Sequence, residues 1–135
     1  MEKTASGQPR NMARRRLRVG VCRRVGETAS IVAERIFEAG DDIVLGADAS
    51  EGLAVPGWTG PAVLVIEGGD LLKLEPGMRI HMCHDKGEDR VVGTFEELVE
   101  RGVPLPLRIN VSKLNIRVRD DISIFANYLA EEASV

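Results

Sequence analysis

The stretch PAVLVIEGGD, residues 61–70, is expected to form the centre of the fold. It begins with a proline, continues with five apolar residues, three of them β-branched, and closes with two glycines and acidic residues. An apolar run of this kind that ends at glycine is typical of a strand buried on both faces. Such strands lie inside parallel sheets covered by helices, whose ligands bind beyond the carboxyl ends of the strands. We therefore expect a site just after residue 66.

The segments before this stretch suggest a parallel arrangement. Residues 17–22 alternate apolar with basic or small residues, which predicts a strand with one buried face. Residues 27–39 carry apolar side chains at three- and four-residue spacing, which predicts a helix, and residues 42–47 predict a second buried strand. Strand, helix and strand in this order form a βαβ unit with a right-handed crossover. A strand at 30–37 is the alternative, because Ile31 and Val32 are β-branched.

The segments after it predict further strands and two more helices. Strands are expected from Met78 to His84, over 105–111 and over 114–118. The sequence Thr-Phe-Glu-Glu at 94–97 matches a capping box and predicts a helix that ends near Gly102. A stripe of apolar residues at helical spacing over 122–133 predicts a last helix, although alternation at 122–128 leaves a strand as the alternative.

Together these elements predict an α/β or α+β fold. We expect one globular domain over residues 14–135, with a mixed sheet of about five or six strands and three helices. The alternative is a mostly β, barrel-like domain in which 30–37 and 122–128 are strands. A length of 135 residues suits a single domain, and 44% apolar and 29% charged residues are ordinary for a globular protein.

Composition also indicates in which cellular compartment the protein is expected. Two cysteines, Cys22 and Cys83, form no disulfide framework, so a cytoplasmic location with free thiols is expected. No apolar run approaches the roughly 18 residues that a membrane span requires, so no membrane contact is expected. Glutamine occurs once and charged residues are frequent, a composition that fits a thermophilic protein.

Charge is unevenly distributed along the chain. Residues 1–25 hold eight basic residues and one acidic residue, a net of +7, whereas the remainder holds ten basic and 20 acidic residues, a net of −10. Residues 1–13 contain almost nothing apolar and are predicted to form a disordered basic tail. The Arg-rich residues 14–24 suit nucleic-acid phosphates, although no interleaved aromatic residue supports this interpretation. The alternative is that this basic arm lies on the chain's own acidic domain.

The first candidate site is a pocket at the ends of two predicted strands. If the strands that end at residues 47 and 66 are parallel neighbours, the loops after them share one edge of the sheet. Carboxylates gathered there beside glycines suit a divalent cation or ribose hydroxyls, although the same residues are common in ordinary loops. The residues of this predicted ligand site are Asp48, Ser50, Glu67, Gly68, Gly69 and Asp70.

The second candidate is an anion site at Arg23, Arg24 and Thr28, between the first predicted strand and the first predicted helix. A helix N-terminus offers free N–H groups and a positive dipole end to a phosphate. The arginines and the hydroxyl would add donors. The segment lacks both glycine-rich phosphate-binding motifs, which favours an ordinary helix start.

The third candidate is a metal site formed by His81, Cys83, His84 and Asp85. On a strand, His81, Cys83 and Asp85 point to one face and His84 points to the other. These side chains are ligand types for zinc or iron, and the neighbouring methionine with the thiolate also suits copper(I). A structural zinc site needs four ligands, and this face offers at most three. The alternative is a strand with a buried cysteine and two histidines near its end.

Three functions follow from these candidates. The first is a non-catalytic domain that binds a small molecule or regulates another protein, and that self-associates as a homo-oligomer. The second is a metal-binding protein or small metal-dependent enzyme that uses the cluster at residues 81–85. The third is a nucleic-acid-associated accessory protein that binds through residues 14–24. The residues indicate no particular cofactor.

Overall fold

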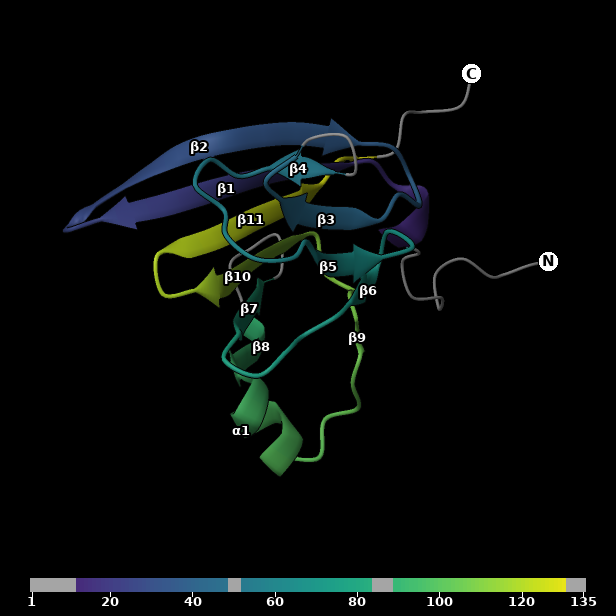
Figure 1. The fold of residues 1–135 in the computed structure, drawn as a ribbon. Coiled ribbons are helices and arrows are strands. Elements are labelled where there is room, and N and C mark those ends of the chain that lie inside the picture. The colour runs from purple at the N-terminus through teal and green to yellow at the C-terminus, as the bar shows by residue number, and fades with distance from the viewer. Residues whose placement is uncertain (1–11, 49–51, 84–88, 131–135) are drawn as a thin grey trace, which may run out of the picture.

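The structure is a computed structural model that describes residues 12–48, 52–83 and 89–130. It is mostly β and consists of two sheets (Figure 1), and no helix among the described residues has seven or more residues. The prediction of an α/β or α+β fold with three helices is therefore wrong. None of the helices in the described ranges is long and apolar enough to cross a membrane.

The larger sheet has six strands that are antiparallel throughout. Strands from the two ends of the chain lie side by side at its centre, so the sheet joins the termini of the domain (Figure 1). In spatial order the strands are β2 (Thr28–Phe37), β1 (Leu17–Val25), β11 (Ile122–Tyr128), β10 (Lys113–Arg119), β7 (Arg79–Cys83) and β8 (Asp89–Thr94).

The smaller sheet has five strands, and the predicted central strand, residues 63–67, occupies its middle position. The pair β3–β4 is parallel and the other pairs are antiparallel. In spatial order the strands are β4 (Leu53–Ala54), β3 (Ile43–Gly46), β5 (Val63–Glu67), β6 (Leu71–Leu72) and β9 (Leu107–Arg108).

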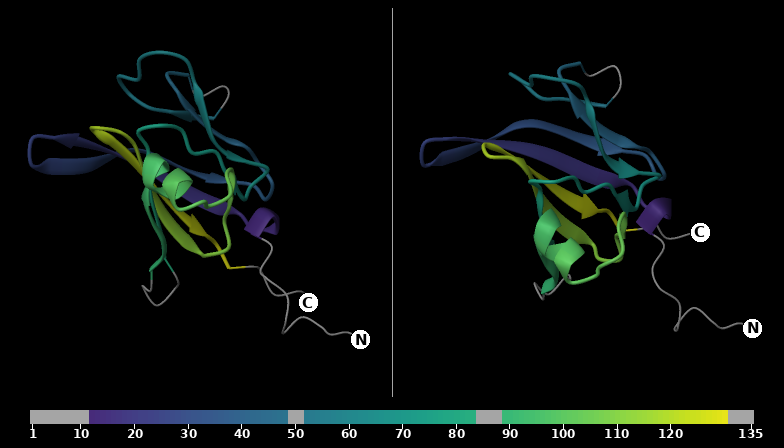
Figure 2. Two further views of the ribbon diagram at one scale, coloured as in Figure 1. Left: turned by 90° about the horizontal axis from the view of Figure 1, so that it is seen from below. Right: turned by 60° about the horizontal axis from the view of Figure 1, so that its bottom comes forward.

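The two sheets form two layers around one hydrophobic core (Figure 2). Val65 and Ile66 of β5 belong to the same buried cluster as Ile116 and Ile124 of the larger sheet. Met12, in the 3-10 turn η2 (Met12–Arg14), is also fully buried. Because apolar side chains of both sheets lose contact with water only when the layers stack, this stacking supplies most of the stabilisation.

The one α-helix within the described residues, α1 (Phe95–Glu100), follows β8 at one end of the molecule (Figure 1). The predicted capping box is confirmed. The Thr94 side chain accepts a hydrogen bond from the Glu97 N–H, and the Glu97 carboxylate accepts one from the Thr94 N–H, at 3.1 and 2.8 Å. Two donors that the helix would otherwise leave unpaired are thereby satisfied.

The helix predicted for residues 27–39 is instead the strand β2. The register of β1 and β2 shifts between Val21 and Cys22, and Val32 has no partner across the pair, as in a β-bulge. Because of this inserted residue, Ala33 and Phe37 lie on the core side of the sheet whereas Ile31 lies on the opposite side. The apolar residues at three- and four-residue spacing therefore belong to both faces of β2, and two of them, Ala29 and Ile36, are exposed.

The helix predicted for residues 122–133 is wrong in the described part, where residues 122–128 form β11. Its buried positions alternate strictly, at Ile122, Ile124, Ala126 and Tyr128. Phe125, which the predicted stripe counted as core, lies on the opposite face of the sheet. One apolar residue on the outside was therefore enough to suggest the wrong period.

The βαβ unit predicted around residues 17–47 does not form either. Its first strand lies in the larger sheet, and its second strand, β3, lies in the smaller sheet. In that sheet β3 pairs with β5 in the antiparallel direction. This direction decides where the predicted site residues lie.

Candidate binding surface

The predicted ligand site does not assemble, because its two loops lie at opposite ends of the β3–β5 pair. Asp48 follows the end of β3, where Leu45 pairs with Val63 at the start of β5. Glu67 is the last residue of β5 and residues 68–70 follow it, near the start of β3, where the Gly68 N–H donates to Asp42 Oδ1 at 2.7 Å. Ser50 lies outside the described residues.

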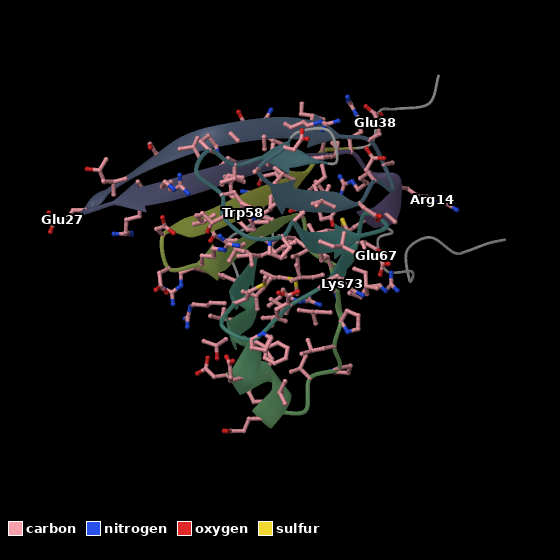
Figure 3. All side chains as sticks on the ribbon, viewed as in Figure 1. Arg14, Glu27, Glu38, Trp58, Glu67 and Lys73 are labelled. Atoms are coloured by element: carbon pink, nitrogen blue, oxygen red, sulfur yellow. The ribbon has the colours of Figure 1, made fainter. Side chains whose placement is uncertain are left out.

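The acidic residues at the end of β5 and in the turn after it have structural partners instead. Glu67 lies 3.3 Å from Lys73 Nζ (Figure 3), and the half-exposed pair contributes little to stability. The carboxylate of Asp70, which is buried, accepts a hydrogen bond from Arg108 Nη1 at 2.8 Å. These contacts connect β5, β6 and β9 within one sheet.

A second contact fixes the glycine turn to the larger sheet. The Tyr128 hydroxyl donates to the Gly69 carbonyl at 2.6 Å, and burial, together with the nearby Asp70 charge, raises the pKa of this phenol. Gly69 has φ of +89°, and a β-carbon there would lie 2.9 Å from the backbone of Gly40. Residues 68–70 therefore serve to join the sheets, and a side chain at Gly69 has no room.

The metal candidates are only partly described. His81 and Cys83 lie on the same face of β7, where they pair with Asn115 and Lys113 of β10. His84 and Asp85 lie outside the described residues. Within the described ranges no group of three or more histidine, cysteine, aspartate or glutamate side chains is placed to hold a metal ion.

The predicted anion site lies on the β1–β2 hairpin, not at a helix start. Glu27 marks the tip of this hairpin in Figure 3, and Arg24 and Thr28 near it are exposed. Arg23 points elsewhere: its guanidinium donates to the Pro56 carbonyl and lies 3.4 Å from the Asp121 carboxylate. The three residues therefore form no common site, and no helix begins here to supply the dipole that the prediction required.

A cluster that the sequence did not reveal surrounds Trp58, in the loop between β4 and β5. The guanidinium of Arg119, at the end of β10, lies 3.6 Å from the centroid of the indole ring and donates to the Thr59 carbonyl at 2.9 Å. The indole N–H donates to the Pro61 carbonyl at 3.1 Å. Trp58 is buried, so this cluster fixes a loop of one sheet to a strand of the other.

A further surface is the face of the six-stranded sheet that points away from the core, here called the outer face. Strand register aligns its residues in three rows that cross the sheet. From β2 toward β8, row 1 is Ile36, Arg18, Asn127, Lys113, Cys83 and Asp89; row 2 is Glu34, Gly20, Phe125, Asn115, His81 and Val92; row 3 is Ile31, Cys22, Ser123, Arg117, Arg79 and Thr94.

Row 2 has an aromatic ring at its centre. Phe125 is half-buried, and its ring extends over the neighbouring strand onto Gly20. A β-carbon at Gly20 would lie 2.2 Å from the ring atoms Cε2 and Cζ, so only glycine at this position allows the ring to lie on the sheet. Asn115, beside the ring on β10, is exposed.

The rows on either side carry the charge. Rows 1 and 3 hold four basic residues, Arg18, Lys113, Arg117 and Arg79, whereas the acidic residues of the three rows are Glu34 and Asp89, each on an edge strand of the sheet. The three rows therefore have a formal net charge of +2, four basic residues against two acidic residues, on a chain whose net charge is −3. Arg18, Lys113 and Arg117 are exposed and form no ion pair with another described residue.

Sequence reasoning missed this surface although part of its signal was visible. Residues 113–119 alternate strictly between polar or basic and apolar side chains, and this alternation predicts one buried and one outward face. The alternation does not show which strands pair with residues 113–119. The Gly20–Phe125 contact and the rows depend on register between distant strands.

Comparison of the chain with protein-family models, with curated proteins and with solved structures finds no match. No relative therefore supplies a ligand or an activity for the outer face.

Proposed function

We propose that this chain is a non-catalytic binding domain and that its outer face binds an anionic partner. The observation that carries the proposal is the arrangement of Arg18, Lys113 and Arg117, exposed and without described ion pairs, on both sides of a central row whose one acidic residue, Glu34, lies on the edge strand β2. The sheet fixes the backbone positions of these cations, so binding an anion would restrict their side chains but not their backbone.

The charge distribution of the whole chain supports the same proposal. An acidic protein gains nothing in solubility from collecting cations on one face, but such a face attracts anions through complementary potential. Arg18 also belongs to the basic arm predicted to contact nucleic acid, and β1 places it in the sheet. The proposal therefore moves the anion-binding surface from a free arm to a folded face.

The test is binding of heparin, a polyanion of high charge density, to the full chain. One variant reverses two outer-face charges, Lys113→Glu with Arg117→Glu. The matched control is Arg14→Glu with Arg16→Glu, which reverses two charges of the basic arm before β1. Both double variants change the formal net charge from −3 to −7, so any effect of net charge alone is equal.

We expect the outer-face variant to lose at least tenfold in heparin affinity and the arm variant to lose less than about threefold. Thermal unfolding of both variants checks that the fold is retained. Equal losses in the two variants, or loss only in the arm variant, would contradict the proposal, because the charge of the sheet would then play no special part.

A further inference from the structure

We infer that the anionic partner of the outer face is a single-stranded nucleic acid whose bases stack on row 2 and whose phosphates contact rows 1 and 3. The inference rests on the proposed function and deepens it. The juxtaposition behind it is an aromatic ring on the surface of a sheet with cations in the two rows beside it.

Phe125 supplies the stacking surface. Because Gly20 has no side chain, the ring lies on the backbone of β1, and it remains partly exposed at the centre of the sheet. An aromatic ring on a sheet surface is a platform on which an unpaired base can stack, whatever its sequence. A chain of bases held in duplex form does not offer its faces to such a ring.

The neighbours of the ring extend the platform in the same direction. Asn115 lies next to Phe125 across the β10–β11 pair, and His81 lies next to Asn115 across the β7–β10 pair. An amide side chain can donate to and accept from base edges, and an imidazole ring offers a further stacking surface. A single strand laid along row 2 would meet these groups in turn.

The flanking rows fit the backbone of such a strand. Residues two apart on a strand lie about 7 Å from each other, so the cations of rows 1 and 3 stand one residue pair away from the ring on each side. Arg18 and Lys113 lie on one side, and Arg117 lies on the other. Phosphates on either side of stacked bases would therefore find a guanidinium or ammonium group within reach.

An acidic polypeptide is the competing partner, and Phe125 distinguishes the two. A polypeptide rich in carboxylates would contact the cations of rows 1 and 3 but would gain little affinity from the partly exposed ring. A single-stranded nucleic acid would gain affinity from the cations and from the ring. The contribution of the ring to affinity is therefore the property to measure.

The experiment compares three probes with the full chain: a fluorescent oligothymidine single strand, the same oligonucleotide annealed to oligoadenine, and polyglutamate. The variant is Phe125→Leu, which keeps an apolar side chain over Gly20 while removing the ring. The control is Phe95→Leu, which removes the half-buried ring at the start of α1, outside the three rows.

We expect Phe125→Leu to weaken single-strand binding about tenfold or more and Phe95→Leu to leave it within about twofold. Replacing Lys113 and Arg117 by glutamate should reduce the slope of log affinity against log salt by about 1.4, the value for two lost phosphate contacts of a single strand. The unmodified chain should bind the single strand more tightly than the duplex.

Two results would overturn the inference and leave the proposed function standing: polyglutamate bound through the outer face while oligothymidine is not bound, or oligothymidine bound with equal affinity by the Phe125→Leu variant. Failure of all anionic probes, heparin included, would overturn the inference and the proposed function together. Thermal unfolding of Phe125→Leu, compared with that of Phe95→Leu, separates loss of binding from loss of structure.

Discussion

The ring of Phe125 on β11 lies on the backbone of Gly20 on β1, directly across the strand pair. A β-carbon at Gly20 would come within 2.2 Å of the ring, far inside van der Waals contact. We predict that Gly20→Ala displaces the ring and lowers the free energy of unfolding by about 1–3 kcal/mol, the usual cost of overpacking. Urea unfolding measures this change.

A double-mutant cycle identifies the cause. In a Phe125→Ala background the methyl group of Gly20→Ala has room, so its cost should largely disappear. An equal cost of Gly20→Ala in both backgrounds would mean that the glycine is required for the conformation of β1 and not for the ring.

The hydrogen bond from Tyr128 to Gly69 should make stability depend on alkaline pH. Burial, with the Asp70 charge, raises the pKa of Tyr128, whereas the unfolded phenol ionises near pH 10. The folded state thus holds a proton that the unfolded state releases, so the contribution of this group is complete below pH about 10 and is lost as pH rises above it. Tyr128→Phe should cost about 1 kcal/mol at neutral pH.

Denaturant unfolding at pH about 8 and about 11 tests this linkage. The unmodified chain should lose more stability between the two values than Tyr128→Phe does. The same loss in both proteins would show that other groups, and not the buried phenol, produce the alkaline transition.

The capping box of α1 should make stability depend on acid pH in the opposite sense. The hydrogen bond from the Thr94 backbone N–H is the main cause that lowers the pKa of Glu97 below its ordinary value of 4.5, and the Thr94 side chain and two nearby arginines add to it. A lowered folded pKa contributes stability above pH 4.5 and loses it as pH falls through the folded value.

We therefore predict that Glu97→Gln lowers the melting temperature at neutral pH and that its difference from the unmodified chain shrinks as pH falls below about 4.5. Glu100→Gln, on the same helix but outside the capping box, is the control and should show a smaller change at neutral pH. A difference for Glu97→Gln that does not vary with pH would contradict the prediction.

The contact between Arg119 and Trp58 gives a direct optical test of how the sheets are joined. Trp58 is the one tryptophan of the chain. The Arg119 guanidinium lies over its ring and donates a hydrogen bond to the carbonyl of the next residue, Thr59. Arg119→Ala should shift the tryptophan emission to longer wavelength and cost about 1–2 kcal/mol, because the ring gains water and a cation–π contact is lost. Arg117→Ala, on the outer face, should leave the emission unchanged.

The sequence predicted elements whose causes are local and failed where the cause lies between distant segments. The capping box at Thr94 and Glu97 needs only neighbours, and α1 forms as expected. The strand at 63–67 was also expected, but its direction relative to β3 depends on the loop between them. That one direction decided whether Asp48 would meet Asp70.

The outer face shows the same limit more clearly. The alternation of residues 113–119 predicts that Lys113 and Arg117 point away from the core. The alternation does not show that Phe125 lies between these two cations and Gly20, because that arrangement depends on the register of three strands, β1, β11 and β10. Apolar residues on the outer face, Ile36 of β2 and Phe125 of β11, were enough to make two strands resemble helices.

The most direct test of the central claim is an NMR titration of the isotope-labelled chain with oligothymidine. If the outer face binds, the amide shifts that change most should belong to β1, β11, β10 and β7, with Phe125, Asn115 and their row neighbours foremost. The loops around Trp58 and Gly69 should change little. Shifts confined to those loops, or to the residues before β1, would contradict the claim that this sheet is the binding surface.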